Sequence, residues 1–455
     1  MASRLISNIH TTRASLAKQF VRPMATSANQ STRTTVLPNG FTVATESNPS
    51  AGAATVGVWV DAGSRLETAQ THGVANFLER VALKGKTSAL EKLGGITKAG
   101  TTREQTFFAT KVLGSNASAS VEILGDLVQG SVSESSVEQA RAGVLKQQQE
   151  ASSQPDQIVF DHLHATAFQG EALGRPVEGY AETISSLTAK DLTEFQKKYY
   201  AANRLVLVGA GDVDHDALVK EAEKAFGSLE PNSSLGKADQ PSFTGSEIRI
   251  RDDLASHARI ALAVESAGYL TPEYYNFLVM QAIIGSYDKT LLGSGNLTSR
   301  LSAVVDQNRL ADSFISFNKA YKDTGLFGIY AITQNRDQID DFVHFLQKEW
   351  VRLSTSVTAS EVEIAKQQVK AGLLLAQQDS TCSLAQSIGS QVLASGKHLS
   401  AAELADKISK VSVKDITATA SKYLWDNEVA VVGTGPVECL TDYNRVRGNM
   451  AYNRF

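Results

Sequence analysis

The sequence has few of the residues that build covalent cross-links or metal sites. Its only cysteines are Cys382 and Cys439, too few for a disulfide framework or for a cysteine-built zinc or iron–sulfur site. No run of 18 or more apolar residues occurs, so no membrane-spanning helix is predicted. No two of the eight histidines stand three, four or five residues apart, which excludes a pair of imidazoles on one helical turn.

Acidic residues are missing from the start of the chain, where the first is Glu46. The preceding segment is rich in Ser, Thr and Ala and carries the basic residues Arg4, Arg13, Lys18, Arg22 and Arg33. This composition predicts a mitochondrial transit peptide over residues 1–30, with a tail that has no targeting role as the alternative. Loss of residues 1–24 would change the net charge from -4 to -8, which disfavours a nucleic-acid partner.

An internal repeat is the strongest pattern that is present. Residues 190–213 and 414–437 align without a gap, and each copy has a helical period followed by a β-branched run and a glycine turn. The identical positions are Lys190, Asp191, Thr193, Lys198, Tyr199, Asn203, Val208, Gly209, Gly211 and Val213, each with its equivalent 224 residues later. Since the period is about half of the 455 residues, the repeat indicates a duplicated domain.

The coarse element pattern favours an α+β fold. Residues 34–46 predict a hairpin around Asn39-Gly40, and each half then has a strand (54–61 and 257–265) followed by helical periodicity. We therefore expect two homologous domains, each a mostly antiparallel sheet with helices packed on it. The expected boundaries are 31–229 for the first domain, 230–245 for a linker and 246–455 for the second domain.

The sequence lacks complete versions of common cofactor-binding and nucleophile motifs. Gly209 and Gly211 follow a predicted strand, but Asp214 occupies the third glycine position of a dinucleotide-binding fingerprint. No G-x-S-x-G segment occurs, so a serine nucleophile elbow is absent from the sequence. His162 and His164 stand two residues apart on a predicted helix, where packing is the expected role.

One segment of the sequence resembles a motif of a known protein family. Residues 73–80, followed by Lys84-Gly85, resemble the helix that carries the inverted zinc motif of the pitrilysin-type metallopeptidases, which include the β subunit of the mitochondrial processing peptidase. Further similar segments are 37–40, 102–106, 160–168, 174–175, 299–301 and 321–328. The resemblance therefore extends over the chain that follows the predicted transit peptide.

The sequence departs from this family at the metal-ligand positions. The resemblance places the two imidazole positions at Asn76 and Arg80, the general-base position at Glu79 and the distal ligand at Gln147. When two neutral imidazoles are replaced by a neutral amide and a fixed cation, a divalent ion meets repulsion from the cation and lacks the ligands that would coordinate it. We therefore expect these four to be degenerate positions, with no bound metal or cofactor, no catalytic residue and no enzymatic activity.

Within the family, the sequence is most similar to the core-protein-1 branch, whose members are non-redox subunits of respiratory complex III. This resemblance implies a scaffold role on the matrix side of the mitochondrial inner membrane. The implied partners are core protein 2, as a heterodimer, with cytochrome b, cytochrome c1 and the small subunits of a complex III dimer. Two alternatives are a zinc-dependent processing peptidase β subunit and a module that binds presequences without cleaving them.

Overall fold

The computed structural model describes residues 32–84, 86–232, 240–291, 299–378 and 380–452. The predicted transit peptide, 1–30, lies outside the described residues, as does the central part, 233–239, of the predicted linker. None of the helices within the described ranges is both long and apolar enough to cross a lipid bilayer.

The first half of the chain forms a six-stranded sheet with the order β1-β2-β6-β3-β5-β4. Only the pair β2–β6 is parallel among its strand pairs. The strands are β1 (Arg33–Val36), β2 (Thr42–Ser47), β3 (Ala53–Val60), β4 (Ile96–Thr101), β5 (Thr106–Leu113) and β6 (Leu205–Gly211). The helices are α2 (Val74–Leu83), α3 (Thr87–Lys92), α4 (Ala117–Gln129), α5 (Glu134–Ala151), α6 (Pro155–Ala167), α7 (Ala181–Ser186), α8 (Ala189–Tyr199) and α9 (His215–Phe226).

The second half repeats this plan in the order β7-β12-β8-β11-β10-β9, with β7–β12 as its parallel pair. Its strands are β7 (Ser246–Arg251), β8 (Ala258–Ala267), β9 (Ser286–Asp288), β10 (Ser313–Ala320), β11 (Thr324–Thr333) and β12 (Ala430–Gly435). Its helices are α10 (Glu273–Ile284), α11 (Arg300–Asn308), α12 (Ile339–Thr355), α13 (Ala359–Gln378), α14 (Thr381–Ser395), α15 (Ala401–Ser409), α16 (Val413–Tyr423) and α17 (Tyr443–Tyr452).

The aligned segments occupy equivalent elements in the two halves. The first copy forms α8 and β6, and the second forms α16 and β12. Asp191 and Asp415, which are identical in the alignment, each complete a capping box that satisfies backbone amides at the start of the helix. The predicted α+β fold of two homologous, mostly antiparallel domains is therefore confirmed, whereas the exact domain boundaries stay a prediction.

Each sheet buries one face against helices of its own half. In the first half, the apolar core on this face includes Val56, Val58, Phe77, Leu124 and Phe226, all essentially without solvent exposure. The equivalent core of the second half includes Leu262, Phe327, Phe342 and Trp350. Burial of one such side chain stabilises the fold by roughly 1.5–3 kcal/mol, so these clusters are the main source of stability in each half.

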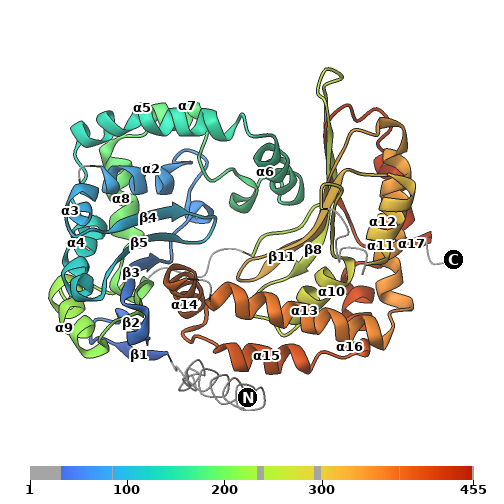
Figure 1. Cartoon of the computed structure of the whole chain (residues 1–455). Coiled ribbons are helices and arrows are strands. Elements are labelled where there is room, and N and C mark those ends of the chain that lie inside the picture. The colour runs from blue at the N-terminus through green and yellow to red at the C-terminus, as the bar shows by residue number, and fades with distance from the viewer. Residues whose placement is uncertain (1–31, 85, 233–239, 292–298, 379, 453–455) are drawn as a thin grey trace, which may run out of the picture.

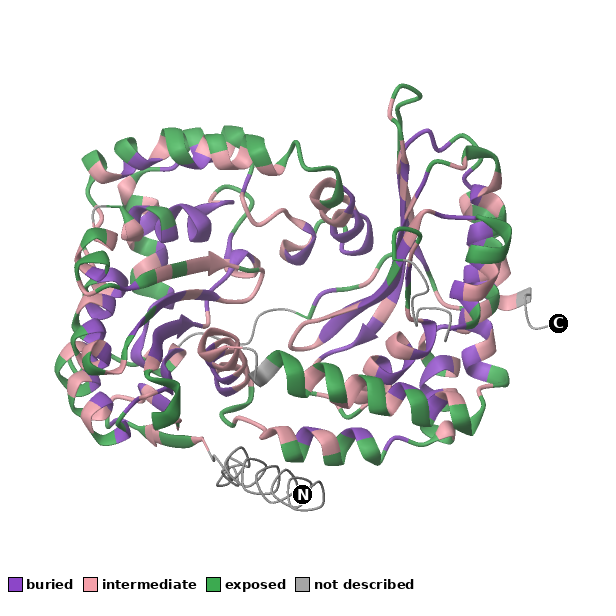
Figure 2. Ribbon diagram, viewed as in Figure 1, coloured by how far each residue is buried: buried purple, intermediate pink, exposed green. Residues whose placement is uncertain are grey.

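The other face of each sheet is covered by a helix from the opposite half. Helix α14 places Ala385, Ile388 and Val392 against Trp59 and Val208 of the first sheet. In return, α6 places Val159 and Leu163 on the second sheet. Figure 1 shows α14 beside the strands of the first lobe and α6 near β8, and Figure 2 shows the buried residues on these two helices. We call this arrangement the reciprocal helix exchange.

A partly buried ion-pair network also joins the halves. Arg65, in the first half, contacts Glu104 at 2.8 Å and Asp323 of the β10–β11 turn at 2.6 Å. The neighbouring Lys322 donates its backbone N–H to Glu104 at 3.1 Å, and its ammonium group contacts Asp61. The Arg65 side chain is only 7% exposed, so these charges satisfy one another within the protein. We call these five residues the interdomain latch.

Candidate functional site

Helix α2 carries three of the four positions singled out in the sequence. It begins after Gly73, whose φ of 92° favours glycine. A Cβ at this position would lie only 3.1 Å from the Cα of Gly179. Just inside the helix start, the Glu67 carboxylate accepts hydrogen bonds from the backbone N–H groups of Gly73 and Ala75, each at 2.8 Å. The first turn of α2 is therefore fixed by a buried acidic side chain.

Asn76 and Arg80 lie one turn apart on α2, as the sequence predicts. Asn76 is buried and its Nδ2 has no hydrogen-bond partner among the described residues, whereas the Arg80 side chain is 44% exposed. Glu79, which stands between these two residues in the sequence, is buried in the structure. Its carboxylate accepts a 2.7 Å hydrogen bond from Oγ1 of Thr101 on β4. The Glu79 carboxylate lies 3.9 Å from Nε of Arg80, which makes a loose ion pair.

The electrostatics of Glu79 reflect its burial. Desolvation raises the pKa of its carboxyl group, while the Thr101 hydrogen bond and the Arg80 charge act in the opposite direction. A carboxyl group with a raised pKa can hold or accept a proton near neutral pH more readily than an exposed one. Glu79 is therefore a buried carboxyl group whose pKa is set by desolvation against one hydrogen bond and one nearby cation.

Gln147 lies on α5, which packs against α2. Its side chain is half-buried, and its Oε1 has no hydrogen-bond partner among the described residues. Among the four predicted positions, the polar contact that the described structure records is the one between Glu79 and Arg80. The fold therefore brings the two helices together, as the resemblance implies, without joining Gln147 to the polar groups of α2.

A zinc ion does not fit the side chains at these positions. Zinc in proteins is held by three or four imidazole, thiolate or carboxylate groups. Asn76, Arg80 and Gln147 supply an amide, a cation and a second amide, so Glu79 is the single group of the right kind. Over the described ranges, no three His, Cys, Asp or Glu side chains are grouped so that they could hold a metal ion.

His164 has a structural environment, as expected from its sequence context. It lies fully buried on α6, where Nδ1 is 2.6 Å from the Phe160 carbonyl oxygen and Nε2 is 2.7 Å from the Tyr321 hydroxyl. Burial and the charge of Arg103 lower the pKa of this imidazole well below its usual range. His164 therefore stays neutral and ties α6 to the β10–β11 turn across the two halves.

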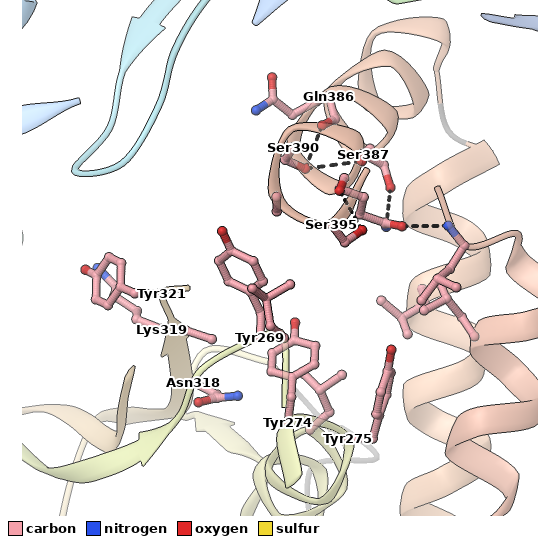
Figure 3. Close-up of a pocket in the computed structure, with 18 of the residues that line it drawn as sticks. Tyr269, Tyr274, Tyr275, Asn318, Lys319, Tyr321, Gln386, Ser387, Ser390 and Ser395 are labelled. Carbon is pink, nitrogen blue, oxygen red and sulfur yellow. Dashed lines mark hydrogen bonds between the residues drawn. The ribbon is translucent and has the colours of Figure 1, made fainter. Parts of the chain in front are cut away.

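A large cavity between the halves was not foreseen from the sequence. Its volume is about 2230 Å³. Its walls come from the β4–β5 turn on the first half, and from α10, the end of β10, α13, α14, α15 and the start of α16 on the second half. Figure 3 shows Tyr269, Tyr274 and Tyr275 across the open space from Ser387 and Ser390 of α14, with Lys319 and Tyr321 at one side. Thr101 lines this cavity and also donates to Glu79, so the α2 positions lie directly behind its wall.

Part of the signal for this cavity was present in the sequence. Residues 384, 388 and 392 are apolar at helical spacing, which predicts a helix, while the residues between them are mostly serine and glutamine. Such an amphipathic helix buries one stripe and presents its polar side to water or to a ligand. The walls themselves could not be assembled from the sequence because they join segments that lie up to about 300 residues apart.

Two family models match the chain. The model described as insulinase, peptidase family M16, matches residues 42–180, and the model described as the peptidase M16 inactive domain matches residues 186–369. The two matches meet within α7, and the second match includes β6 and the region between β6 and β7. The chain therefore matches two M16 domain models in succession, in agreement with a two-domain chain.

Relatives of known name cover nearly the whole chain. The mitochondrial-processing peptidase subunit beta of Blastocladiella emersonii is 44% identical over 96% of this chain and 98% of its own length. The probable mitochondrial-processing peptidase subunit beta of Schizosaccharomyces pombe is 46% identical over 96% of this chain and 98% of its own length. Among solved structures, a chain of complex III2 from Candida albicans, with Inz-5 bound, is 30% identical with a TM-score of 0.84, over 92% of this chain and 99% of that chain.

These relatives correct one expectation from the sequence. We expected no enzymatic activity because Asn76 and Arg80 replace two imidazoles. The similar chains at 44–46% identity carry the name of a peptidase subunit, which points to an enzyme and contradicts that expectation. The expectation failed because it inferred the role of a whole chain from the metal-ligand positions of one helix.

Proposed function

Because this chain belongs to the M16 peptidase family, we propose that it acts in the mitochondrion as a core subunit of a complex III assembly, of the core protein 1 kind. The observation that carries this proposal is the match to a chain of complex III2 over 92% of this chain and 99% of that chain, with a TM-score of 0.84. A likeness over both domains and their relative placement supports the same architectural role.

The proposal includes the position and partners of the subunit. The chain pairs with core protein 2 and lies on the matrix face of the inner membrane, against cytochrome b, cytochrome c1 and the small subunits of a dimeric complex III. The mitochondrial names of the relatives support this compartment. Peripheral attachment is consistent with helices that, over the described residues, do not span a bilayer.

Co-migration tests this proposal. Mitochondrial membranes are solubilised with mild detergent at neutral pH and the complexes are separated on a native gel. We expect this chain to be recovered with the membrane fraction and to migrate in the band that contains cytochrome b. If the chain is released and migrates free of cytochromes, the complex III assignment is wrong.

Peptide processing is the second candidate function, favoured by the peptidase names of relatives that are 44–46% identical. The assembly that contains this chain is incubated with a mitochondrial presequence peptide, and cleavage is followed by mass spectrometry. Cleavage that is lost in Glu79→Gln and kept in the matched surface variant Glu194→Gln would assign the reaction to this chain. Binding of the presequence without cleavage would instead support a presequence-binding module.

A further inference from the structure

Lys319 lies near the end of β10, where the second sheet meets the cavity. Its side chain lines the cavity and is partly exposed, and Figure 3 shows it beside Tyr321 at the edge of the open space. The cavity volume of about 2230 Å³ is more than twice that of the pockets that hold drug-sized ligands, roughly 300–1000 Å³. A dissolved reagent can therefore reach this amine in the folded chain.

The ammonium group of Lys319 lies on an aromatic surface. Its Nζ is 3.9 Å from the centre of the Phe160 ring, which belongs to α6. The Phe160 ring packs edge-on against Phe317 of β10, with 5.2 Å between the ring centres, and lies 5.3 Å from the ring of Tyr330 on β11. These rings take the place of water that would otherwise hydrate the ammonium group, so the charged form loses part of its solvation.

Acidic side chains do not compensate for this loss. Within the described residues, the Lys319 ammonium group has neither an ion pair nor a hydrogen bond to a side chain. Asp161 of α6 is paired with Arg103 at 2.9 Å. Glu265, which the register places on the same face of the sheet, accepts a 2.9 Å hydrogen bond from Thr324. The other titratable groups on the adjoining elements also have partners: Glu104 with Arg65, His164 with Tyr321, and Tyr330 with Asp156.

These surroundings favour the neutral amine. Desolvation and the nearby charge of Arg103 lower the pKa of Lys319 from the ordinary 10.5 to about 8, while Asp161 acts in the opposite direction. The Phe160 ring also stabilises the charged form, and we expect it to offset this lowering only in part. The unprotonated amine is the nucleophilic form of lysine, so Lys319 has more of the reactive form near neutral pH than a lysine in water.

The access, the aromatic surface and the missing counter-charge together suit a covalent reaction. From its place on an open cavity, its contact with Phe160 and the lack of an acidic partner among the described residues, we propose that Lys319 is a site of acylation by activated acyl groups of the thioester class. The unprotonated Nζ attacks the carbonyl carbon of the thioester. An amide N–C bond forms, the C–S bond breaks, and the sulfur leaves as a thiol with the proton that the amine releases.

The acylated side chain fits the same surroundings. Its amide carries no charge, so the cost of removing an ammonium group from water disappears. The acyl carbon atoms can pack against the Phe160 ring, as the stem of a long polar side chain does on an apolar surface. Acylation would accompany either candidate function, since all of the groups around Lys319 belong to this one chain.

Site-resolved acetylation tests the inference. The full-length chain in its native assembly is incubated with acetyl-CoA at pH 7, and tandem mass spectrometry follows the acetylated fraction of each lysine with time. Lys98 is the matched internal control, because it lines the same cavity and is exposed. We expect Lys319 to be acetylated at least about fivefold faster than Lys98, and its rate to approach a plateau between about pH 8 and 9. A rate equal to or below that of Lys98 would overturn the proposal.

Two charge variants should change the rate in opposite directions. Arg103→Gln removes the neighbouring cation and frees Asp161, so the amine is protonated more often and acetylation of Lys319 at pH 7 should slow about threefold to tenfold. Asp161→Asn leaves Arg103 without its carboxylate, so acetylation should become about threefold faster. Lys190, on the outer surface of α8 with an 83% exposed side chain, should react at the same rate in the wild type and both variants. If one variant fails to fold, the other decides the outcome. Unchanged rates at Lys319, or changes in the same direction, would contradict the inference.

Discussion

Glu67 caps helix α2 from inside the protein. It is 5% exposed and accepts two backbone hydrogen bonds at the start of the helix, while Arg175 donates to its carbonyl oxygen at 3.1 Å. Burial raises the pKa of this carboxyl group to about 8, and the two amide hydrogen bonds and the charge of Arg175 act against this shift. The protonation state of one residue is thereby linked to the stability of the helix that carries Glu79.

The pH dependence of stability follows from this raised pKa. In the unfolded chain Glu67 titrates near 4.5, so between pH 4.5 and 8 the folded protein holds a proton that the unfolded chain has released. The contribution of Glu67 is then fully present below pH 4.5 and is lost as the pH rises through 8, on the order of 5 kcal/mol in total.

Glu67→Gln should remove this dependence, because an amide does not titrate over the range. We expect a flatter profile of melting temperature between pH 5 and 9, together with a loss of about 1–3 kcal/mol at pH 5, since the amide nitrogen cannot accept the second backbone hydrogen bond. The control Glu194→Gln, on the exposed side of α8, should keep the wild-type profile. A steep profile retained in Glu67→Gln would show that another group is responsible.

At the scale of elements, α14 depends on one glycine. A Cβ at Gly389 would lie 2.3 Å from the ring of Trp59, so the helix can dock on the first sheet only because this side chain is absent. Trp59 is itself 1% exposed and packed into the sheet, which leaves it no room to move aside. The position therefore sets the distance between α14 and the sheet.

Gly389→Ala should displace α14 and cost about 1–3 kcal/mol, as overpacked cores do. The matched control is Gly372→Ala on α13, where an added Cβ would meet nothing within 4 Å. Because alanine favours helix more than glycine does, the control should be neutral or stabilise by up to about 1 kcal/mol. Thermal unfolding and Trp59 fluorescence measure both variants. Equal stability of the two would refute the close-packing explanation.

The elements also show how far the sequence was informative. The repeat predicted α8–β6 and α16–β12 because local periodicity and a shared capping Asp are visible in the chain. Helix α14 was missed because serine, glycine and glutamine dilute its apolar stripe. Asn76, Glu79 and Arg80 were placed on one helix correctly, yet the hydrogen bond from Thr101 to Glu79 depends on a tertiary contact that no local pattern encodes.

At the scale of the molecule, the interdomain latch holds the β10–β11 turn to the first half. Asp323→Asn should remove one of the two carboxylates that satisfy the partly buried Arg65, at a cost of about 1–2 kcal/mol. We expect a lower melting temperature and faster proteolysis between the halves. Asp253→Asn is the control, because its ion pair with Arg251 is solvent-exposed and should contribute little to stability. Equal effects of the two variants would rule out a special role for the latch.

The reciprocal helix exchange makes each half incomplete alone. Expressed separately, residues 32–245 would leave Trp59 without α14, and residues 246–455 would leave the second sheet without α6. We expect each fragment to aggregate, because it exposes an apolar sheet face, and co-expression to recover a soluble pair. Size-exclusion chromatography measures both outcomes. A soluble, monomeric first fragment would contradict this prediction.

The same exchange affects how the chain acquires its shape during synthesis. Ribosomes deliver the N-terminus first, and Ile388 and Val392 emerge only after nearly nine-tenths of the polypeptide has been made. Until then the inner surface of the leading lobe has no cover, and contacts so distant in sequence form late. A nascent chain of this design would rely on chaperones to shield that surface, and it would be suited to an import route that admits only unfolded precursors.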